Sequence, residues 1–124
     1  MLDKISADRP FLLLTQRRTG ATFLASVLSE VSSFDTVQHE PFNLDRQFGS
    51  LTSHFMRSSD KLCLKIGIRD KLCKKPNIKH CFEVVPFEVT KSLICVAEEL
   101  GYGIVLHLRR NELDRLLSLG TALA

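Results

Sequence analysis

Residues 11–23, FLLLTQRRTGATF, decide the fold of this chain. Residues 11–16 form a short and nearly continuous apolar run, which is typical of a strand buried on both faces of a parallel sheet. A polar turn with one glycine follows at residues 17–22. Beyond the turn, apolar residues recur at helical spacing as Leu24, Val27, Leu28 and Val31. The stretch therefore predicts a strand, a turn and a helix over residues 22–32.

Three further segments have the composition of strands. Residues 34–39 are expected to form a second short strand, which must end there because Pro41 cannot extend a ladder and restrains the residue before it. Residues 62–68 (LCLKIGI) alternate well enough for a third strand, and residues 104–108 (IVLHL) are another buried-strand run. Residues 71–79 are expected to be a loop.

Three more helices are predicted. The clearest one starts at Pro86, a residue suited to a first helical turn, and ends at Gly101. Its apolar residues keep the helical period as Val89, Leu93, Val96, Ala97 and Leu100. Residues 44–60 are expected to form one irregular helix. Near the end of the chain, Asn111 with Asp114 resembles an N-cap signal before a leucine-rich helix.

Helices that alternate with apolar strands indicate an α/β protein with a mostly parallel sheet and right-handed crossovers. We expect a P-loop-like three-layer α/β/α arrangement. The chain has 124 residues, fewer than the roughly 150 residues of a typical domain. We therefore expect a single domain over residues 1–124, and an incomplete one, because the chain stops fourteen residues after Arg110.

Composition and charge exclude several classes of protein. With 44% hydrophobic and 25% charged residues, the chain is neither disordered nor fibrous. Its 17 basic and 14 acidic residues leave a net charge of +3, which suits an anionic ligand but falls short of a nucleic-acid-binding signature. No apolar run approaches the ~18 residues of a membrane helix, and the N-terminus lacks the pattern of a signal peptide. We expect a cytoplasmic protein without a transmembrane segment.

The spacing of the four cysteines includes no CxxC pair, which would indicate a zinc site or a redox centre. His80 next to Cys81, with Cys73 upstream, offers only three ligands, and we interpret this group as structural. Reduced, mostly buried thiols and no bound metal are therefore expected.

The turn after the first strand has the chemistry of an anion site. N–H groups at a helix start and the positive end of the helix dipole attract an anion, and Gly20 lets the backbone approach it closely. Thr19 and Thr22 can donate hydroxyl hydrogen bonds, and Arg18 can add a forked contact. The turn lacks the pattern GxxxxGK[ST] of a Walker loop, which disfavours ATP hydrolysis. A simple helix cap formed by one of the threonines is the competing structural interpretation.

A second basic turn follows the last strand, at the carboxyl end where open α/β sheets bind ligands. It contains Arg109 and Arg110, and Ser118 lies eight residues after Arg110. At a rise of about 1.5 Å per residue, Arg110 and Ser118 lie on roughly one side of a helix, about 12 Å apart along its axis. Two such turns indicate a ligand with two anionic groups.

Together these motifs resemble the PAPS-dependent sulfotransferases, where PAPS is 3′-phosphoadenosine 5′-phosphosulfate, and most closely the bacterial branch that sulfates carbohydrates and glycolipids. In that family a strand, a loop with a basic residue before Ser/Thr-Gly-x-Thr, and a helix bind the 5′-phosphosulfate, and residues 17–23 are similar to it. Arg110 and Ser118 fit the family's 3′-phosphate site. The resemblance implies the cofactor-binding residues Arg17, Arg18, Thr19, Gly20, Ala21, Thr22, Phe23, Arg110 and Ser118.

The resemblance also implies a reaction. The chain would transfer a sulfuryl group from PAPS to a hydroxyl of a carbohydrate or glycolipid, without a metal. Glu40-Pro41 is similar to a dipeptide whose glutamate is assigned as the base, so Glu40 would take the acceptor's proton. Arg18 would stabilise the charge that builds on the leaving phosphate. His39 is an alternative base.

Two other functions stay open. A P-loop-type nucleotide or metabolite kinase would prefer ATP or ADP with Mg²⁺, and the missing Walker lysine argues against it. The second open function is that of a truncated, non-enzymatic member of the sulfotransferase family, because the resemblance covers only the N-terminal part of a typical member. In that case the segments that close over the adenine and form the acceptor pocket are missing.

Overall fold

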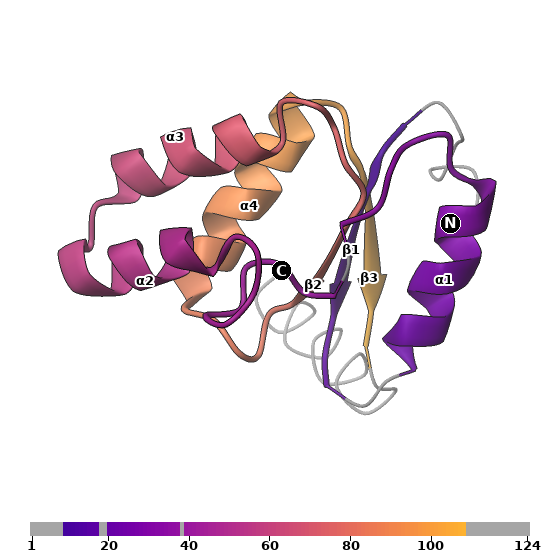
Figure 1. Ribbon diagram of the computed structural model, residues 1–124, viewed down its shortest axis with the longest axis horizontal. Helices are drawn as coiled ribbons and strands as arrows, with labels where there is room; N and C mark the ends of the chain where they lie inside the picture. Colours follow the sequence, from indigo (N-terminus) through magenta and orange to yellow (C-terminus); the bar gives the residue numbers. More distant parts are fainter. Residues whose placement is uncertain (1–8, 18–19, 38, 109–124) are drawn as a thin grey trace, which may run out of the picture.

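The computed structural model describes residues 9–17, 20–37 and 39–108. In these ranges strands and helices follow one another along the chain (Figure 1). They are β1 (Phe11–Thr15), α1 (Ala21–Val31), α2 (Gly49–Ser58), α3 (Lys61–Lys71), β2 (Ile78–Cys81), α4 (Phe87–Glu99) and β3 (Gly103–His107). None of the helices in these ranges has the length and apolar character that crossing a membrane requires.

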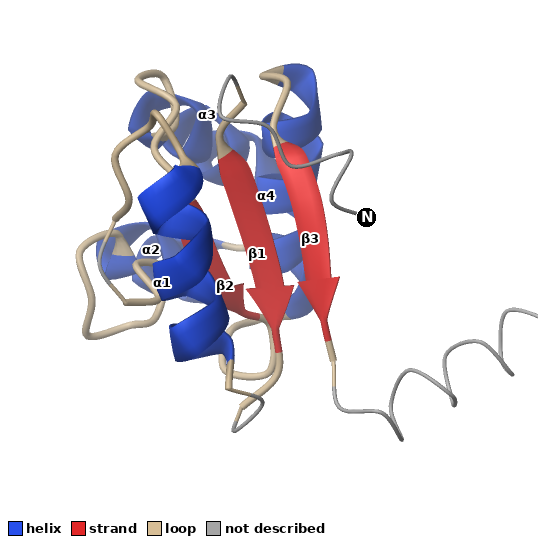
Figure 2. Cartoon of the chain, turned by 90° about the vertical axis from the view of Figure 1, so that its right-hand side faces the viewer, coloured by secondary structure: helices blue, strands red, loops and turns tan. Residues whose placement is uncertain are grey.

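The strands described here form one parallel sheet in the order β2-β1-β3. β1 lies in the middle, where Leu12 is aligned with Ile78 on one side and with Ile104 on the other. α1 covers one face of the sheet and α4 covers the other, with α3 and α2 packed beyond α4 (Figure 1, Figure 2). Right-handed crossovers put helices on opposite faces when the chain reverses direction across a sheet, as it does between β2 and β3. The α/β class and the parallel sheet are confirmed.

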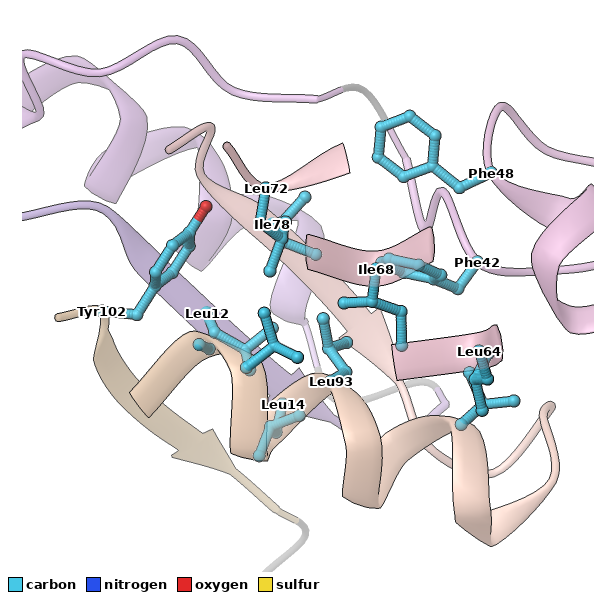
Figure 3. Packing of buried hydrophobic residues seen from close by; sticks show 13 residues of the cluster. Leu12, Leu14, Phe42, Phe48, Leu64, Ile68, Leu72, Ile78, Leu93 and Tyr102 are labelled. Atoms are coloured by element: carbon cyan, nitrogen blue, oxygen red, sulfur yellow. The ribbon is translucent and has the colours of Figure 1, made fainter. Parts of the chain in front are cut away.

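β1 is buried along its whole length and contributes to a hydrophobic cluster on each face of the sheet. Successive side chains of a strand point to opposite faces. Leu12 and Leu14 join the larger cluster, which extends through α4 to α3 (Figure 3). Phe11 and Leu13 join the smaller cluster, where they meet Leu28 of α1. Because burial of one such side chain contributes about 1.5–3 kcal/mol, these few residues of β1 hold both helical layers.

Asn77 ties the amino end of the sheet to the segment after α1. Its side chain is fully buried, and its Oδ1 accepts a hydrogen bond from the Phe11 N–H at 2.9 Å. Its Nδ2 lies 2.9 Å from Ser32 Oγ, 3.0 Å from Phe34 O and 3.2 Å from Thr36 Oγ1. Residues 34–37 are thereby held alongside the edge of β2.

The prediction of a strand at residues 62–68 is wrong, because this segment lies in α3. Leu64 and Ile68 are buried four residues apart, a spacing that places both on one face of a helix as well as on one face of a strand. The helix is fixed by its start: the Asp60 side chain accepts a hydrogen bond from the Cys63 N–H at 3.0 Å, a standard N-cap contact.

The predicted strand at residues 34–39 is wrong as well: among its described residues, 34–37 and 39, the pairing is limited to a parallel bridge between Thr36 and Asn77. The expected loop at residues 71–79 ends early, because Ile78 begins the four-residue strand β2. Turns precede α2 in place of one irregular helix over residues 44–60. β1, α1, α4 and β3 confirm their predictions to within two residues.

Candidate functional site

The candidate site lies at the carboxyl ends of β1 and β2, which share one edge of the parallel sheet (Figure 2). The Phe82 N–H donates a hydrogen bond to Thr15 O at 3.2 Å, so the segments leaving the two strands stay together for one further residue. A pocket at this edge is lined by residues of the turn after β1, by Lys79 of β2 and by Glu40. Ligands of open α/β sheets bind at this edge.

Gly20 gives the turn after β1 its shape. It has φ of 77° and ψ of 18°, which is the left-handed region, and it is the N-cap of α1. A Cβ at this position would meet nothing within 4 Å, so the backbone conformation requires glycine and crowding does not. Glycine has no side chain that could cap α1, and the first turn of α1 contains no acidic residue. The positive end of the helix dipole is therefore not neutralised by an acid of that turn.

Lys79 is the centre of a group of three polar side chains. Its Nζ lies 3.0 Å from Thr22 Oγ1 and 3.3 Å from Glu40 Oε1. The side chains of Lys79 and Glu40 are 13% and 23% exposed, so solvent screens this ion pair less than it screens pairs on the open surface. The group joins α1, β2 and the loop before α2, which are distant in sequence.

Glu40 is positioned by the residues that follow it. Pro41 and Phe42 are buried, and the Phe42 ring packs edge-on against the rings of Phe48 and His80, with centroids 5.4 Å and 5.9 Å away. The Phe48 N–H donates to Pro41 O at 2.7 Å. The Glu40 carboxylate therefore projects from a loop whose following residues are anchored in the core.

Two pockets lie on either side of this group. The first, which we call the turn pocket, has a volume of about 340 Å³ and is lined by Thr15, Gln16, Arg17, Gly20, Ala21, Thr22, Glu40 and Lys79. The second, which we call the hydroxyl pocket, has a volume of about 370 Å³ and is lined by Thr22, Ala25, Ser26, Ser29, Thr36, Val37, His39, Glu40 and Lys79. Thr22, Glu40 and Lys79 form the wall that the two pockets share.

Negative charge is also present at the turn pocket. The Glu83 carboxylate, on the turn after β2, accepts a hydrogen bond from the backbone N–H of Arg17 at 2.6 Å. Cys81, the last residue of β2, is buried nearby; burial raises the pKa of its thiol, and the negative charges of Glu83 and Glu40 act in the same direction. A thiol with a raised pKa is a poor nucleophile, so Cys81 is not a candidate nucleophile.

The predicted site residues are only partly brought together. Arg17, Gly20, Ala21 and Thr22 line the turn pocket, and Glu40 lines it as well. Phe23 is 76% exposed on α1 and lines neither the turn pocket nor the hydroxyl pocket. Four further predicted residues lie outside the described residues: Arg18, Thr19, Arg110 and Ser118.

Lys79 is the residue that sequence reasoning missed. It stands in a lysine-rich stretch that was expected to be a solvated loop, whereas the structure has it in β2 between the buried residues Ile78 and His80. The signal that could have identified it is that Lys79 is the one charged residue in the short segment from Ile78 to Cys81. Three other lysines of the stretch, at positions 71, 74 and 75, are exposed as expected.

His80 points away from the site into the core. Its Nε2 lies 2.8 Å from Thr90 Oγ1, and burial lowers the pKa of the imidazole to about 4. In the described part of the chain, no three His, Cys, Asp or Glu side chains are placed to hold a metal ion. The expectation of mostly buried thiols is wrong, because Cys63 and Cys73 are exposed, Cys95 is half-buried and Cys81 alone is buried. His39, the alternative base, lines the hydroxyl pocket.

Comparisons of the chain with protein-family models, with curated proteins and with solved structures give no match.

Proposed function

We propose that this chain carries the phosphosulfate-binding and proton-transfer parts of a PAPS-dependent sulfotransferase with a P-loop-like α/β fold. The observation that carries the proposal is the group of Lys79, Glu40 and Thr22 on the wall shared by two pockets. Transfer of a sulfuryl group to a hydroxyl is assisted by a proton acceptor and by an anion-binding group close to both substrates. The group supplies both.

The turn pocket suits the anionic end of the donor. The positive end of the α1 dipole and the ammonium of Lys79 favour an anion there, and the left-handed Gly20 lets the backbone approach it. A volume of about 340 Å³ is at the lower end of the ~300–1,000 Å³ usual for ligand pockets and is sufficient for the phosphosulfate end of the donor. The 3′-phosphate is assigned to Arg110 and Ser118, outside the described residues.

The hydroxyl pocket suits the acceptor. Four residues with hydroxyl groups line it, Thr22, Ser26, Ser29 and Thr36. Hydroxyl groups both donate and accept hydrogen bonds, which matches the hydroxyl groups of a carbohydrate or of a glycolipid headgroup. Glu40 lines the same pocket, so its carboxylate is available to an acceptor hydroxyl.

The proposed reaction uses the residues of the wall that the two pockets share. Glu40 takes the proton of the acceptor hydroxyl as the acceptor oxygen bonds to sulfur, and the bond from sulfur to the phosphate oxygen breaks. Lys79 and the N–H groups of the turn stabilise the negative charge that builds on the leaving phosphate. The products are the sulfate ester and adenosine 3′,5′-bisphosphate.

A thermal melt tests the proposal. Adenosine 3′,5′-bisphosphate at about 100 times its dissociation constant should stabilise the chain by about 2.7 kcal/mol, which raises the Tm by roughly 10 °C. ADP with Mg²⁺ should have little effect. Lys79→Met should weaken the binding of the bisphosphate by roughly tenfold, because it removes a charge-assisted contact.

The matched control is Lys91→Met, which removes the same charge from an exposed position on α4. It should leave the Tm shift unchanged. A shift with ADP alone would favour a kinase, and a cooperative melt that neither nucleotide raises would favour a non-enzymatic chain.

A further inference from the structure

Two of the hydroxyl groups that line the hydroxyl pocket belong to a chain of hydrogen bonds. Ser29 lies on α1 and Thr36 lies in the segment that follows α1, and both residues are half-buried. Their hydroxyl oxygens are 2.9 Å apart, and by distance alone either could donate to the other. The direction of this hydrogen bond decides what this wall of the pocket offers to a ligand.

The backbone of α1 fixes that direction. The Ser29 hydroxyl donates a hydrogen bond to the carbonyl oxygen of Ala25 at 2.7 Å, and a carbonyl oxygen can only accept. A hydroxyl group has a single hydrogen, so the Ser29 hydrogen is already used at Ala25. The hydrogen between Ser29 and Thr36 must therefore come from Thr36.

The buried Asn77 supports the same direction. The orientation of its amide is set by the Phe11 N–H, which can only donate and therefore faces Oδ1. The Nδ2 on the other side of the amide donates to Thr36 Oγ1 at 3.2 Å. The chain of hydrogen bonds thus runs from Asn77 through Thr36 and Ser29 to Ala25, and bonds that point the same way polarise and strengthen one another.

This chain leaves only acceptors for a ligand at these two positions. Each hydroxyl oxygen has two lone pairs. One lone pair of Ser29 is occupied by Thr36 and one lone pair of Thr36 by Asn77, whereas both hydroxyl hydrogens are used inside the protein. The carboxylate of Glu40, which lines the same pocket, is an acceptor as well. A ligand group that meets this wall must therefore donate.

We propose that Ser29 and Thr36 are specificity-determining residues of the hydroxyl pocket: they accept hydrogen bonds from free hydroxyl or amino groups of the acceptor. This inference rests on the proposed function and narrows its substrate class to polyols and amino sugars whose groups beside the reacting hydroxyl are unsubstituted. A sugar that carries an ether or a sulfate ester at such a position offers only acceptor oxygens. It would leave this wall without hydrogen bonds, and sites built to bond one group reject the analogue that lacks it.

Ligand-observed NMR with sugar probes tests this assignment. The probes are the methyl glycosides of glucose, galactose and mannose, each compared with analogues in which fluorine replaces a hydroxyl group. Fluorine keeps the size of the group nearly unchanged but cannot donate. For a glycoside that binds, at least one analogue should bind about three- to tenfold more weakly to the natural chain, which corresponds to the loss of a hydrogen bond. The control Ser50→Ala removes an exposed hydroxyl from α2 and should behave like the natural chain.

Two variants separate the direction of the hydrogen bonds from a simple loss of contact. Ser29→Ala removes one acceptor and releases the Thr36 hydrogen to the pocket, so the penalty for the fluorinated analogue should disappear. Thr36→Val removes the other hydroxyl but leaves the Ser29 hydrogen bonded to Ala25. It should weaken the binding of the glycoside and retain a penalty for the analogue. A cooperative melt of each variant shows that it is folded.

The outcomes distinguish this inference from the proposed function. Equal binding of every glycoside and its analogues by the natural chain would overturn the specificity role and leave the proposed function standing, and so would a penalty that Ser29→Ala retains in full. Absence of glycoside binding by all of the proteins, with binding of adenosine 3′,5′-bisphosphate intact, would overturn the specificity role together with the assignment of the hydroxyl pocket to the acceptor. Absence of binding of both kinds of ligand would overturn the proposed function as well.

Discussion

Replacing Asn77 by alanine should be among the most destabilising single changes in the described part of the chain. The substitution leaves the buried Phe11 N–H without its acceptor, which costs about 2 kcal/mol for a buried unsatisfied group. It also removes the amide donors from Ser32, Phe34 and Thr36, and two such hydrogen bonds contribute about 1 kcal/mol each. The free energy of unfolding should therefore fall by about 4 kcal/mol, a large part of the 5–15 kcal/mol that is usual for a domain.

Urea denaturation followed by circular dichroism measures this loss. For a slope near 2 kcal/mol per molar urea, the midpoint should fall by about 2 M while the slope stays unchanged. Ser32→Ala removes the Oγ that accepts from Asn77 Nδ2 and from the Phe34 N–H, and it should cost about 1–2 kcal/mol, less than Asn77→Ala. Ser50→Ala, exposed at the start of α2, should change nothing. A loss below about 1 kcal/mol for Asn77→Ala would refute the reasoning, because other groups would then satisfy the Phe11 N–H.

Three further predictions concern the site and its surroundings. Glu40→Gln should leave the binding of adenosine 3′,5′-bisphosphate intact and abolish sulfuryl transfer in a chain that turns over; unchanged transfer would remove Glu40 from the mechanism. His80 has a pKa lowered to about 4, so the unfolded chain binds more protons than the folded one between this value and the ordinary pKa of about 6.5. The free energy of unfolding should have its full value above about pH 6.5 and should fall by up to about 3 kcal/mol toward pH 4. Urea midpoints measured across that pH range would record the fall. If the pH dependence of stability persists unchanged in His80→Gln, other groups cause it. Gly20→Ala should lower the free energy of unfolding by about 1–2 kcal/mol, because a residue with a Cβ is strained at the left-handed φ of 77° even though the Cβ itself would meet no neighbouring atom. An unchanged Tm would mean that the turn adopts another conformation.

The parts of the fold that were predictable are those that local signals determine. The apolar run of β1, the glycine-containing turn after it and the helical spacing of apolar residues in α4 depend on neighbours within a few residues. α3 was not predictable from its pattern, because LCLKIGI places Leu64 and Ile68 on one face in either conformation. The packing of α3 against α4 and the cap at Asp60 decide for the helix.

The residues of the candidate site were also predictable only where local signals determine them. The turn after β1 and Glu40 were predicted from contiguous motifs, and Glu40 does face the turn pocket. Lys79 and Glu83 were not predicted, because each contacts a partner that is distant in sequence. Lys79 meets Glu40 only after β2 has paired with β1, and Glu83 meets Arg17 only after the two strand ends have joined.

The central position of β1 has a consequence for motion. It is paired with β2 on one side and with β3 on the other, and both hydrophobic clusters include its side chains. Its amide hydrogens should therefore exchange with solvent only when the whole unit unfolds, whereas α1, with Val27 and Val31 exposed and two buried residues, should open at lower free energy. The turn pocket then has one wall fixed to the slowest-exchanging strand and another that can yield, and a ligand bound between them should slow hydrogen exchange chiefly in α1.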